Sequence, residues 1–394
     1  MSHNVSEKCS YSENCIFIPN HFNYKTYHRY FLSNQFSHYP VTSILTVLRA
    51  APYNKPIITV EVLLIFSAAQ MEFKKNILLI FTLRLLFANA LTVQESWVKF
   101  KNDFNKTYRN IVNEILDMEV FQENFKIIYQ HNARYNAGLE TYFMSINQFA
   151  DVSPGEFSKQ LVYKHNNQKY LQNKVETSFE EVNATVPAFV DWRLSGIVGN
   201  VQDQENCKSS WAFSAVGAIE CQYAIKIKQN LDLSKQQLID CIRQNCDSGG
   251  YLEQAFEFAK QRGLKLEPAY KYNAQRDVCK IPTGPYKIKN YTYVVPANEV
   301  ALKNAVSIIG PISVTISAEA LQFYGGGIFQ TGNCHCPDCS TNHAVLVVGY
   351  GHDPQEYWVI KNSWGTTWGE KGYMRLARNV GECGIPGQAL YPIL

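Results

Sequence analysis

The sequence lacks the features that mark membrane-spanning and nucleic-acid-binding proteins. Its 394 residues contain no uninterrupted apolar run of about 18 residues, the length that a helix needs to cross a bilayer. The 37 basic and 34 acidic side chains leave a formal net charge of only +3, with no long basic run interleaved with aromatic residues. We therefore expect no membrane span and no binding of nucleic acid.

Charged residues are also scarce, at 18%, against 46% hydrophobic residues, which suits a globular chain that can bury a substantial core. Cysteine, in contrast, is abundant. Cys9 and Cys15 lie near the start, and the other nine of the 11 cysteines fall between Cys207 and Cys383. This clustering predicts disulfides and an oxidising compartment, so we expect an extracellular or lysosomal protein.

An export signal is expected inside the chain. Two lysines after Met71, an apolar run and the small residues 88–90 follow the order of a secretory signal peptide. We predict a signal peptide over residues 71–90 and interpret residues 1–70 as a non-native N-terminal extension. Because Arg84 interrupts the apolar run, a genuine N-terminal tail with an internal anchor is the alternative.

The rest of the chain divides into three parts. Between Val93 and Gly138, aromatic and aliphatic residues recur every three or four positions, which predicts two amphipathic helices. Residues 163–186 are polar and predict an exposed linker that proteases can cut. Residues 187–394 predict helices at 209–220 and 252–260, followed beyond Lys280 by antiparallel strands, hence an α+β fold.

Four strings in this last part resemble the papain-like cysteine peptidases of the cathepsin L type. They are VDWR, SSWAFSAVGAIE, NHAVLVVGYG and KNSWGTTWGEKGYMRLAR, at residues 190–193, 209–220, 342–351 and 361–378. The resemblance covers residues 93–394 and implies a papain-like two-domain fold, with a helical left domain and an antiparallel β-barrel right domain. It also implies an α-helical inhibitory pro-domain over residues 91–162.

In that family a cysteine attacks the peptide carbonyl, a histidine transfers protons, an asparagine orients the histidine and a glutamine helps to bind the oxyanion. The resemblance places the last three at His343, Asn362 and Gln204, and puts Ser210 at the nucleophile position. A serine hydroxyl is too weak an acid to form the family's thiolate–imidazolium pair. We therefore expect a proteolytically inactive protein, in which Ser210 caps a helix without doing chemistry.

Two alternatives stay open. In the first, His343 acts as general base for Ser210, as in serine hydrolases, which the resemblance to silicateins, with serine at this position, allows. In the second, Ser210 is a sequence error and the protein is a cysteine-type endopeptidase. Glu205 and Lys208 stand where the family usually has glycine, and we expect their long side chains to obstruct the substrate's path.

The resemblance also implies a peptide or protein ligand in the cleft. Gly249 and Gly250 would hold it as an added strand, although an extra residue after Cys246 shifts their register. Trp364 would shield the bond between the asparagine and the histidine. A main specificity pocket that prefers an apolar side chain is implied at Tyr251, Leu252, Thr315, Ala344 and Gln388.

Several modifications are expected. The resemblance implies the disulfides Cys207–Cys246, Cys241–Cys279 and Cys334–Cys383. We expect a further Cys336–Cys339 bridge rather than a metal cluster with His335, a free core thiol at Cys221, and no cofactor. Sequons predict N-glycosylation at Asn105, Asn183 and Asn290.

The pro-domain is the second expected partner of the cleft, and its motif is incomplete. The family pattern is kept at Phe121, Asn124, Ile128, Asn132, Asn147, Phe149 and Asp151. Asn113, Asp117 and Ser145 replace a Glu, an Arg and a Gly of that pattern. Loss of the Glu–Arg pair predicts a missing helix-to-helix tie and a pro-domain that is held less firmly.

Overall fold

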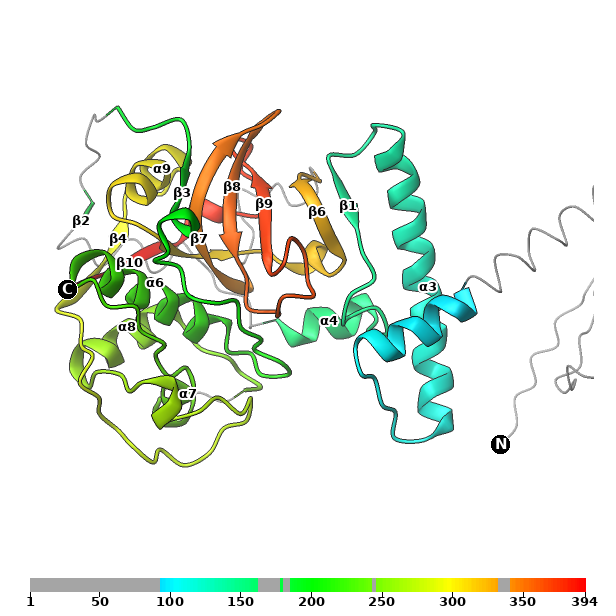
Figure 1. The fold of residues 1–394 in the computed structure, drawn as a ribbon, viewed down its shortest axis with the longest axis horizontal. Coiled ribbons are helices and arrows are strands. Elements are labelled where there is room, and N and C mark those ends of the chain that lie inside the picture. The colour runs from blue at the N-terminus through cyan, green and yellow to red at the C-terminus, as the bar shows by residue number, and fades with distance from the viewer. Residues whose placement is uncertain (1–92, 162–177, 180–184, 243–245, 332–340) are drawn as a thin grey trace, which may run out of the picture. The chain divides into compact units, whose positions relative to one another are not determined.

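The structure, a computed structural model, describes residues 93–161, 178–179, 185–242, 246–331 and 341–394 (Figure 1). The predicted signal peptide, the N-terminal extension, Asn183 and the cysteines between 334 and 339 lie outside these ranges. Within them, no helix is both long and apolar enough to cross a membrane. The same residues hold no group of three side chains suited to bind a metal ion.

The predicted amphipathic helices are present. The first spans residues 93–103, and the second, α3 (Ile111–Asn136), begins where the Asn110 side chain accepts a hydrogen bond from the Asn113 N–H. They are followed by β1 (Tyr142–Met144) and α4 (Pro154–Gln160), which starts with a capping box. Their shared core contains Trp97, Phe100, Phe121 and Ala150.

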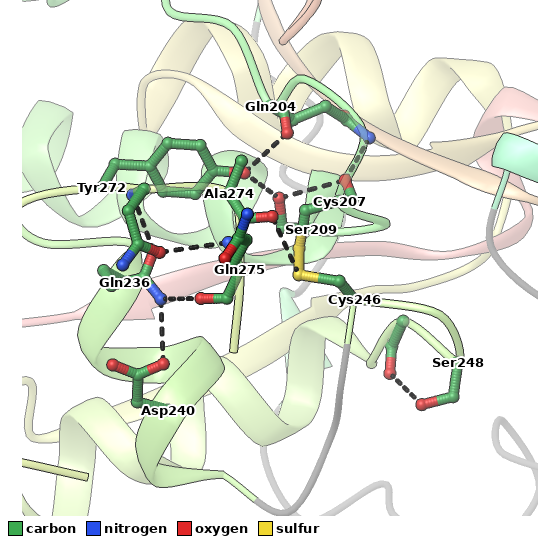
Figure 2. Close-up of a disulfide and its surroundings, with 12 residues drawn as sticks. Gln204, Cys207, Ser209, Gln236, Asp240, Cys246, Ser248, Tyr272, Ala274 and Gln275 are labelled. Carbon is green, nitrogen blue, oxygen red and sulfur yellow. Dashed lines mark hydrogen bonds between the residues drawn. A yellow bond between two sulfur atoms is a disulfide. The ribbon is translucent and has the colours of Figure 1, made fainter. Parts of the chain in front are cut away.

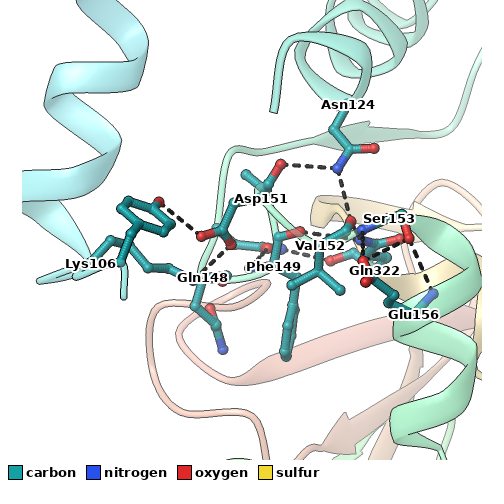
Figure 3. Close-up of polar contacts among 12 residues, drawn as sticks. Lys106, Asn124, Gln148, Phe149, Asp151, Val152, Ser153, Glu156 and Gln322 are labelled. Carbon is teal, nitrogen blue, oxygen red and sulfur yellow. Dashed lines mark hydrogen bonds and ion pairs between the residues drawn. The ribbon is translucent and has the colours of Figure 1, made fainter. Parts of the chain in front are cut away.

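The two helices are tied together without the Glu–Arg pair. Lys101 on the first helix forms an ion pair with Glu114 on α3. Lys106 Nζ lies 2.7 Å from Asp151 Oδ1 (Figure 3), and the Tyr108 hydroxyl donates to Asp151 Oδ2 at 3.0 Å. The Lys101–Glu114 pair thus supplies a tie between the two helices in place of the missing Glu–Arg pair, and the looser hold of the pro-domain stays a prediction.

The first half of residues 187–394 is helical, as predicted. Its helices are α6 (Ser210–Lys226), α7 (Gln236–Cys241) and α8 (Leu252–Gln261). α6 and α8 pack together in one apolar core, and Cys221 of α6 is a buried free thiol. The structure contains the disulfides Cys207–Cys246 and Cys241–Cys279, and Cys383 is also disulfide-bonded.

The second half is a β-sheet. Its strands are β2 (Ser178–Phe179), β3 (Val190–Asp191), β4 (Asn290–Val294), β5 (Ile312–Ile316), β6 (Tyr324–Phe329), β7 (His343–His352), β8 (Glu356–Lys361), β9 (Tyr373–Ala377) and β10 (Ala389–Ile393). They pair in the order β1-β6-β9-β8-β7-β5-β10-β4-β2, with β3 beside β7. The pairs are antiparallel except for β6–β9 and β2–β4. Short 3-10 segments lie at Trp192–Ser195, Glu267–Ala269, Glu319–Leu321 and Ile385–Gly387.

Two elements differ from the predicted pattern. A helix, α9 (Glu299–Ile308), interrupts the strand region beyond Lys280, and the Asn298 side chain caps it by accepting from the Ala301 N–H. The linker contributes a two-residue strand, β2 (Ser178–Phe179), which pairs with β4. The linker is thus part of the sheet at this point.

The pro-domain adds a strand to the sheet at its β6 edge. Phe143 of β1 lies opposite Gly326 of β6, where a Cβ atom would come within 2.7 Å of the Phe143 ring. Glycine is therefore needed for this close approach. Gln322 forms a second contact with the pro-domain. Its side-chain Nε2 donates to the Val152 carbonyl at 2.7 Å (Figure 3), and its main-chain carbonyl accepts from Asn147 Nδ2 at 2.7 Å.

We predict that Asp117→Asn stabilises the precursor at neutral pH. Burial, and then the negative charges of Asp151 and Glu156, raise the pKa of Asp117, and Lys106 opposes them only partly. The folded state disfavours the ionised form of Asp117, so ionisation lowers the free energy of unfolding at pH values above the pKa that Asp117 has in the folded protein. This destabilisation fades as the pH falls toward about 4, the pKa of an unperturbed aspartate. The melting temperature of Asp117→Asn should exceed that of the parent at pH 7 and match it in acid.

The control is Glu119→Gln, because Glu119 is exposed on the same helix and should leave the melting temperature unchanged at both pH values. An equal gain for Asp117→Asn at neutral and acid pH would contradict the electrostatic explanation.

Candidate active site

The segment that leads into α6 is held from several sides. The Cys207–Cys246 disulfide anchors its middle. The Tyr272 hydroxyl donates to the Gln204 carbonyl at 2.7 Å and lies 2.8 Å from Ser209 Oγ (Figure 2). These contacts leave the start of α6 in one position beside the sheet.

Ser210 is the first residue of α6 and is fully buried. The cap position belongs to Ser209, whose side chain makes no capping hydrogen bond. Ser210 Oγ instead accepts from the Ala344 N–H on β7 at 3.2 Å. The interpretation of Ser210 as the helix N-cap is therefore wrong, because its hydroxyl is bound by the neighbouring strand.

His343 stands at the start of β7 and contacts Asn362. His343 Nε2 lies 2.8 Å from Asn362 Oδ1, which also accepts from the Ser363 N–H at 2.8 Å. Because that oxygen only accepts, Nε2 carries the proton and Nδ1 keeps the lone pair. Burial lowers the pKa of His343 to about 4, opposed by the hydrogen bond to Asn362, so the ring is neutral at neutral pH.

Trp364 packs on His343, as expected for a shielding residue. The two ring centroids are 4.6 Å apart, and Trp368 packs edge-on against Trp364 with centroids at 5.0 Å. Phe149 and Phe157 of the pro-domain pack on the same Trp364 ring at 5.6 and 5.4 Å. The pro-domain thus buries the aromatic wall beside the histidine.

The polar groups of the site are not arranged for proton transfer in this state. Within the described ranges, no hydrogen bond joins Ser210 Oγ to His343. Gln204 uses both ends of its amide, because Nε2 donates to the Cys207 carbonyl at 2.9 Å and Oε1 accepts from Ser363 Oγ at 2.7 Å. Asn362 Nδ2 is buried and has no hydrogen-bond partner.

The glycine pair lies beside the start of α6. Gly249 has a φ of +67°, which glycine adopts without strain. A Cβ atom on Gly250 would come within 2.6 Å of the Trp211 ring, so only glycine fits there. Both glycines are buried, and their role in holding a ligand stays a prediction.

The expected pocket residues lie together. Tyr251, Leu252, Thr315, Ala344 and Gln388 line one cavity of about 20 Å³ that also touches Ser210 and His343. The sequence did not single out Thr341 and Asn342, which complete the wall. Both directly precede His343 in the chain, and this proximity is the signal that could have identified them.

Glu205 and Lys208 occupy different backbone conformations. Glu205 has a φ of +51°, its N–H donates to Asp203 at 2.8 Å, and its side chain is exposed. Lys208 is partly buried, and its N–H donates to the Cys246 carbonyl at 2.9 Å. Obstruction of the cleft by either side chain stays a prediction.

The two described sequons differ in exposure. Asn105 is exposed, with a φ of +49°. Asn290 is partly buried at the start of β4, and its Oδ1 accepts from Lys260 Nζ at 3.2 Å. Glycosylation of both stays a prediction.

Comparison with known proteins assigns the fold to a family. Residues 186–393 match the family described as papain family cysteine protease, and residues 97–157 match the cathepsin propeptide inhibitor domain. The chain belongs to the papain family. It is 37% identical over 314 residues to a cathepsin L-like proteinase of Phaedon cochleariae, which covers 78% of this chain and 95% of that protein.

Two further relatives extend the likeness. Testin-2 of Rattus norvegicus is 38% identical over 311 residues, covering 76% of this chain and 92% of that protein. Procathepsin L 3 from the larval midgut of Tenebrio molitor has a similar solved structure, with a TM-score of 0.71 and 38% identity over 77% of this chain and 99% of that chain. The papain-family member described here therefore has the architecture of a procathepsin.

We predict that Glu205→Gly stabilises the protein. A non-glycine residue in the left-handed region costs about 1 kcal/mol or more, and Glu205 is in that region. The free energy of unfolding should rise by up to about 1 kcal/mol, measured by chemical denaturation.

Lys208→Gly is the matched control. Lys208 is not among the residues with positive φ, so glycine there should lower the free energy of unfolding by about 0.5–1 kcal/mol. A loss of stability in Glu205→Gly equal to that in Lys208→Gly would contradict the strain argument.

Proposed function

We propose that this chain is a papain-family protein in which Ser210 occupies the nucleophile position and thiol-dependent proteolysis is lost. Its remaining activity is to bind an extended peptide or protein segment in the cleft. The observation that carries this proposal is the environment of Ser210, whose hydroxyl accepts from the Ala344 N–H at 3.2 Å beside a histidine with a pKa lowered to about 4.

The chemistry of the two side chains supports this conclusion. The family mechanism starts from a thiolate paired with an imidazolium. A serine hydroxyl cannot ionise in that way, and His343 is buried and neutral. The cleft therefore lacks both charges of the pair from which attack on a carbonyl begins.

A Ser210–His343–Asn362 hydrolase is the second candidate, and one observation favours it. His343 Nδ1 keeps its lone pair because Nε2 is bonded to Asn362, and a neutral imidazole can serve as general base. A base with a pKa of about 4 is, however, weak at neutral pH, because general bases work best with a pKa near the operating pH. We therefore rank this function second.

The proposed location is extracellular or lysosomal. Two described disulfides support it, because such bonds persist in oxidising compartments. The predicted signal peptide is consistent with the same route. The proposed partners are the pro-domain of the chain and a peptide or protein ligand, without a cofactor.

We predict that the protein cleaved at its linker shows no thiol-type peptidase activity. An epoxide probe for cysteine proteases should not label residue 210, because a hydroxyl is not a thiolate. Ser210→Cys alone should restore little hydrolysis, and the triple variant with Glu205→Gly and Lys208→Gly should restore more, measured as kcat/KM on a peptide substrate.

Labelling of the parent protein at residue 210 would refute the loss of thiol chemistry and identify the serine as a sequence error. Full activity of the single Ser210→Cys variant would show that Glu205 and Lys208 leave the cleft open. A Ser210→Ala variant controls for background hydrolysis.

We predict that the purified precursor does not process itself. In acid it should stay full length, because Ser210 cannot cut the linker by the thiolate route. An added active cathepsin should trim the linker, whose polar sequence is typical of protease-sensitive segments, to a product that starts near residue 186 or 187. Gel mobility and N-terminal sequencing over time report both outcomes.

Self-cleavage at a rate independent of concentration, absent in Ser210→Ala, would make Ser210 a working nucleophile. The Ser-His-Asn hydrolase would then replace the non-hydrolytic proposal.

A further inference from the structure

A second cavity lies apart from the cleft and is much larger than the pocket beside Ser210. It has a volume of about 400 Å³, and all the residues that line it fall between positions 196 and 235. They come from the segment before α6, from α6 itself and from the segment that leads into α7. Ser210, His343 and Asn362 do not line it. A cavity of this volume can hold a small ligand.

Two buried charges line this cavity. Lys235 is 3% exposed and Glu220 is 6% exposed. Lys235 Nζ lies 3.1 Å from Glu220 Oε1 and 3.0 Å from Oδ1 of Asp232, whose side chain is open to solvent. The Leu233 N–H also donates to Glu220 Oε1, at 2.8 Å. One oxygen of the buried carboxylate therefore has two donors.

The other oxygen of Glu220 has no donor. Within the part of the chain that the structure describes, no hydrogen bond or ion pair reaches Glu220 Oε2. This oxygen faces Gly199, because a Cβ atom on Gly199 would lie 3.5 Å from it, and both residues line the cavity. Buried carboxylate oxygens normally accept a hydrogen bond. A ligand that brings a donor into the cavity would supply one.

The cavity also carries an excess of negative charge. Its lining contains two carboxylates, those of Glu220 and Asp232, and a single ammonium group, that of Lys235. Two further charged residues interact with these groups, and their charges are opposite, because one is Glu267 and the other is Lys361. The excess of one negative charge favours a ligand with one positive charge and disfavours an anion.

We propose that this cavity binds a primary ammonium group on an unbranched apolar stem, as in an alkylamine or a lysine side chain. The ammonium group donates to Glu220 Oε2. It suits this single free oxygen as a compact point charge, whereas the planar guanidinium of arginine pairs best with two oxygens at once. The partly buried side chains of Ile197, Val198 and Leu231 line the same cavity and can cover the stem.

The test measures the binding of three small probes to the intact precursor by isothermal titration calorimetry at constant ionic strength. The probes are pentylammonium, 1-pentanol and pentanoate, which share an apolar stem and differ in charge. Pentylammonium should bind about tenfold more tightly than 1-pentanol, and pentanoate should bind no more tightly than 1-pentanol. Equal binding of pentylammonium and 1-pentanol, or no saturable binding of pentylammonium, overturns the proposal.

Two variants assign the binding to this cavity. Gly199→Leu places a side chain in it, starting from a Cβ atom that makes only ordinary contact, and should weaken pentylammonium binding about tenfold or more. Glu220→Gln keeps the shape of the side chain and removes its charge, so the ratio of the pentanol and pentylammonium dissociation constants should fall below about twofold. Unchanged pentylammonium binding in Gly199→Leu overturns the proposal.

Gly155→Leu is the matched control. Gly155 lies on α4, and a Cβ atom there meets open space, so this variant should bind pentylammonium as the parent does. Melting temperatures verify that each variant is folded. If Glu220→Gln does not fold, Gly199→Leu still decides the outcome, because it leaves every charged residue of the cavity in place.

A fourth probe identifies the source of the ammonium group. It is lysine blocked at its main-chain amine and carboxyl groups. If blocked lysine binds as tightly as pentylammonium and Gly199→Leu weakens both, the cavity takes a lysine side chain of a partner protein. If only pentylammonium binds, it takes a free amine, and both results support the shared chemistry. None of these measurements involves peptide binding or hydrolysis in the cleft, so their failure leaves the proposed function standing.

Discussion

The close packing of α6 against the sheet is the constraint on which the site depends. Ser214 Oγ donates to the Val345 carbonyl at 2.7 Å, and a Cβ atom on Gly217 would lie 3.1 Å from the Leu346 side chain. Small residues on α6 let the helix approach the strand this closely, as interiors pack without gaps. This contact sets the position of Ser210 on the helix relative to His343 on β7. The two halves of the site therefore meet through core packing, and they meet in the same way whichever small residue stands at position 210.

The fold can therefore stay intact in a protein whose catalytic activity is lost. His343, Asn362 and Trp364 are held by the sheet and by one another, so a change at Ser210 removes none of their contacts except its own. The pro-domain is similarly independent, because it docks through β6, Gln322 and Trp364 rather than through the nucleophile. Binding of the inhibitory segment and catalysis thus rest on different atoms, and the first can persist without the second.

Much of the fold could be predicted from the sequence, since long apolar runs and family strings cover α6 and β7 and place His343 and Asn362. The rest depends on contacts that no local pattern shows. α9 follows a single Asn298 cap within a strand-rich region, and β1 is a strand only because it pairs with glycines of β6. The Lys101–Glu114 pair shows the same limit, because a sequence displays charges without showing which of them meet across a turn.

The pocket makes this limit relevant to function. Its walls follow from family positions such as Leu252 and Ala344, which suggest an apolar ligand. Gln388 also lines it, and the orientation of that amide follows from the hydrogen bond to Glu253, a residue 135 positions away in the chain. A sequence does not show such a bond, so family positions alone do not describe the polar atoms of the pocket. The residue at the position of Ser210 can likewise change while the fold that carries it is retained. The ligand of such a protein has to be inferred from the atoms that face the cleft, because family membership fixes only where those atoms are placed.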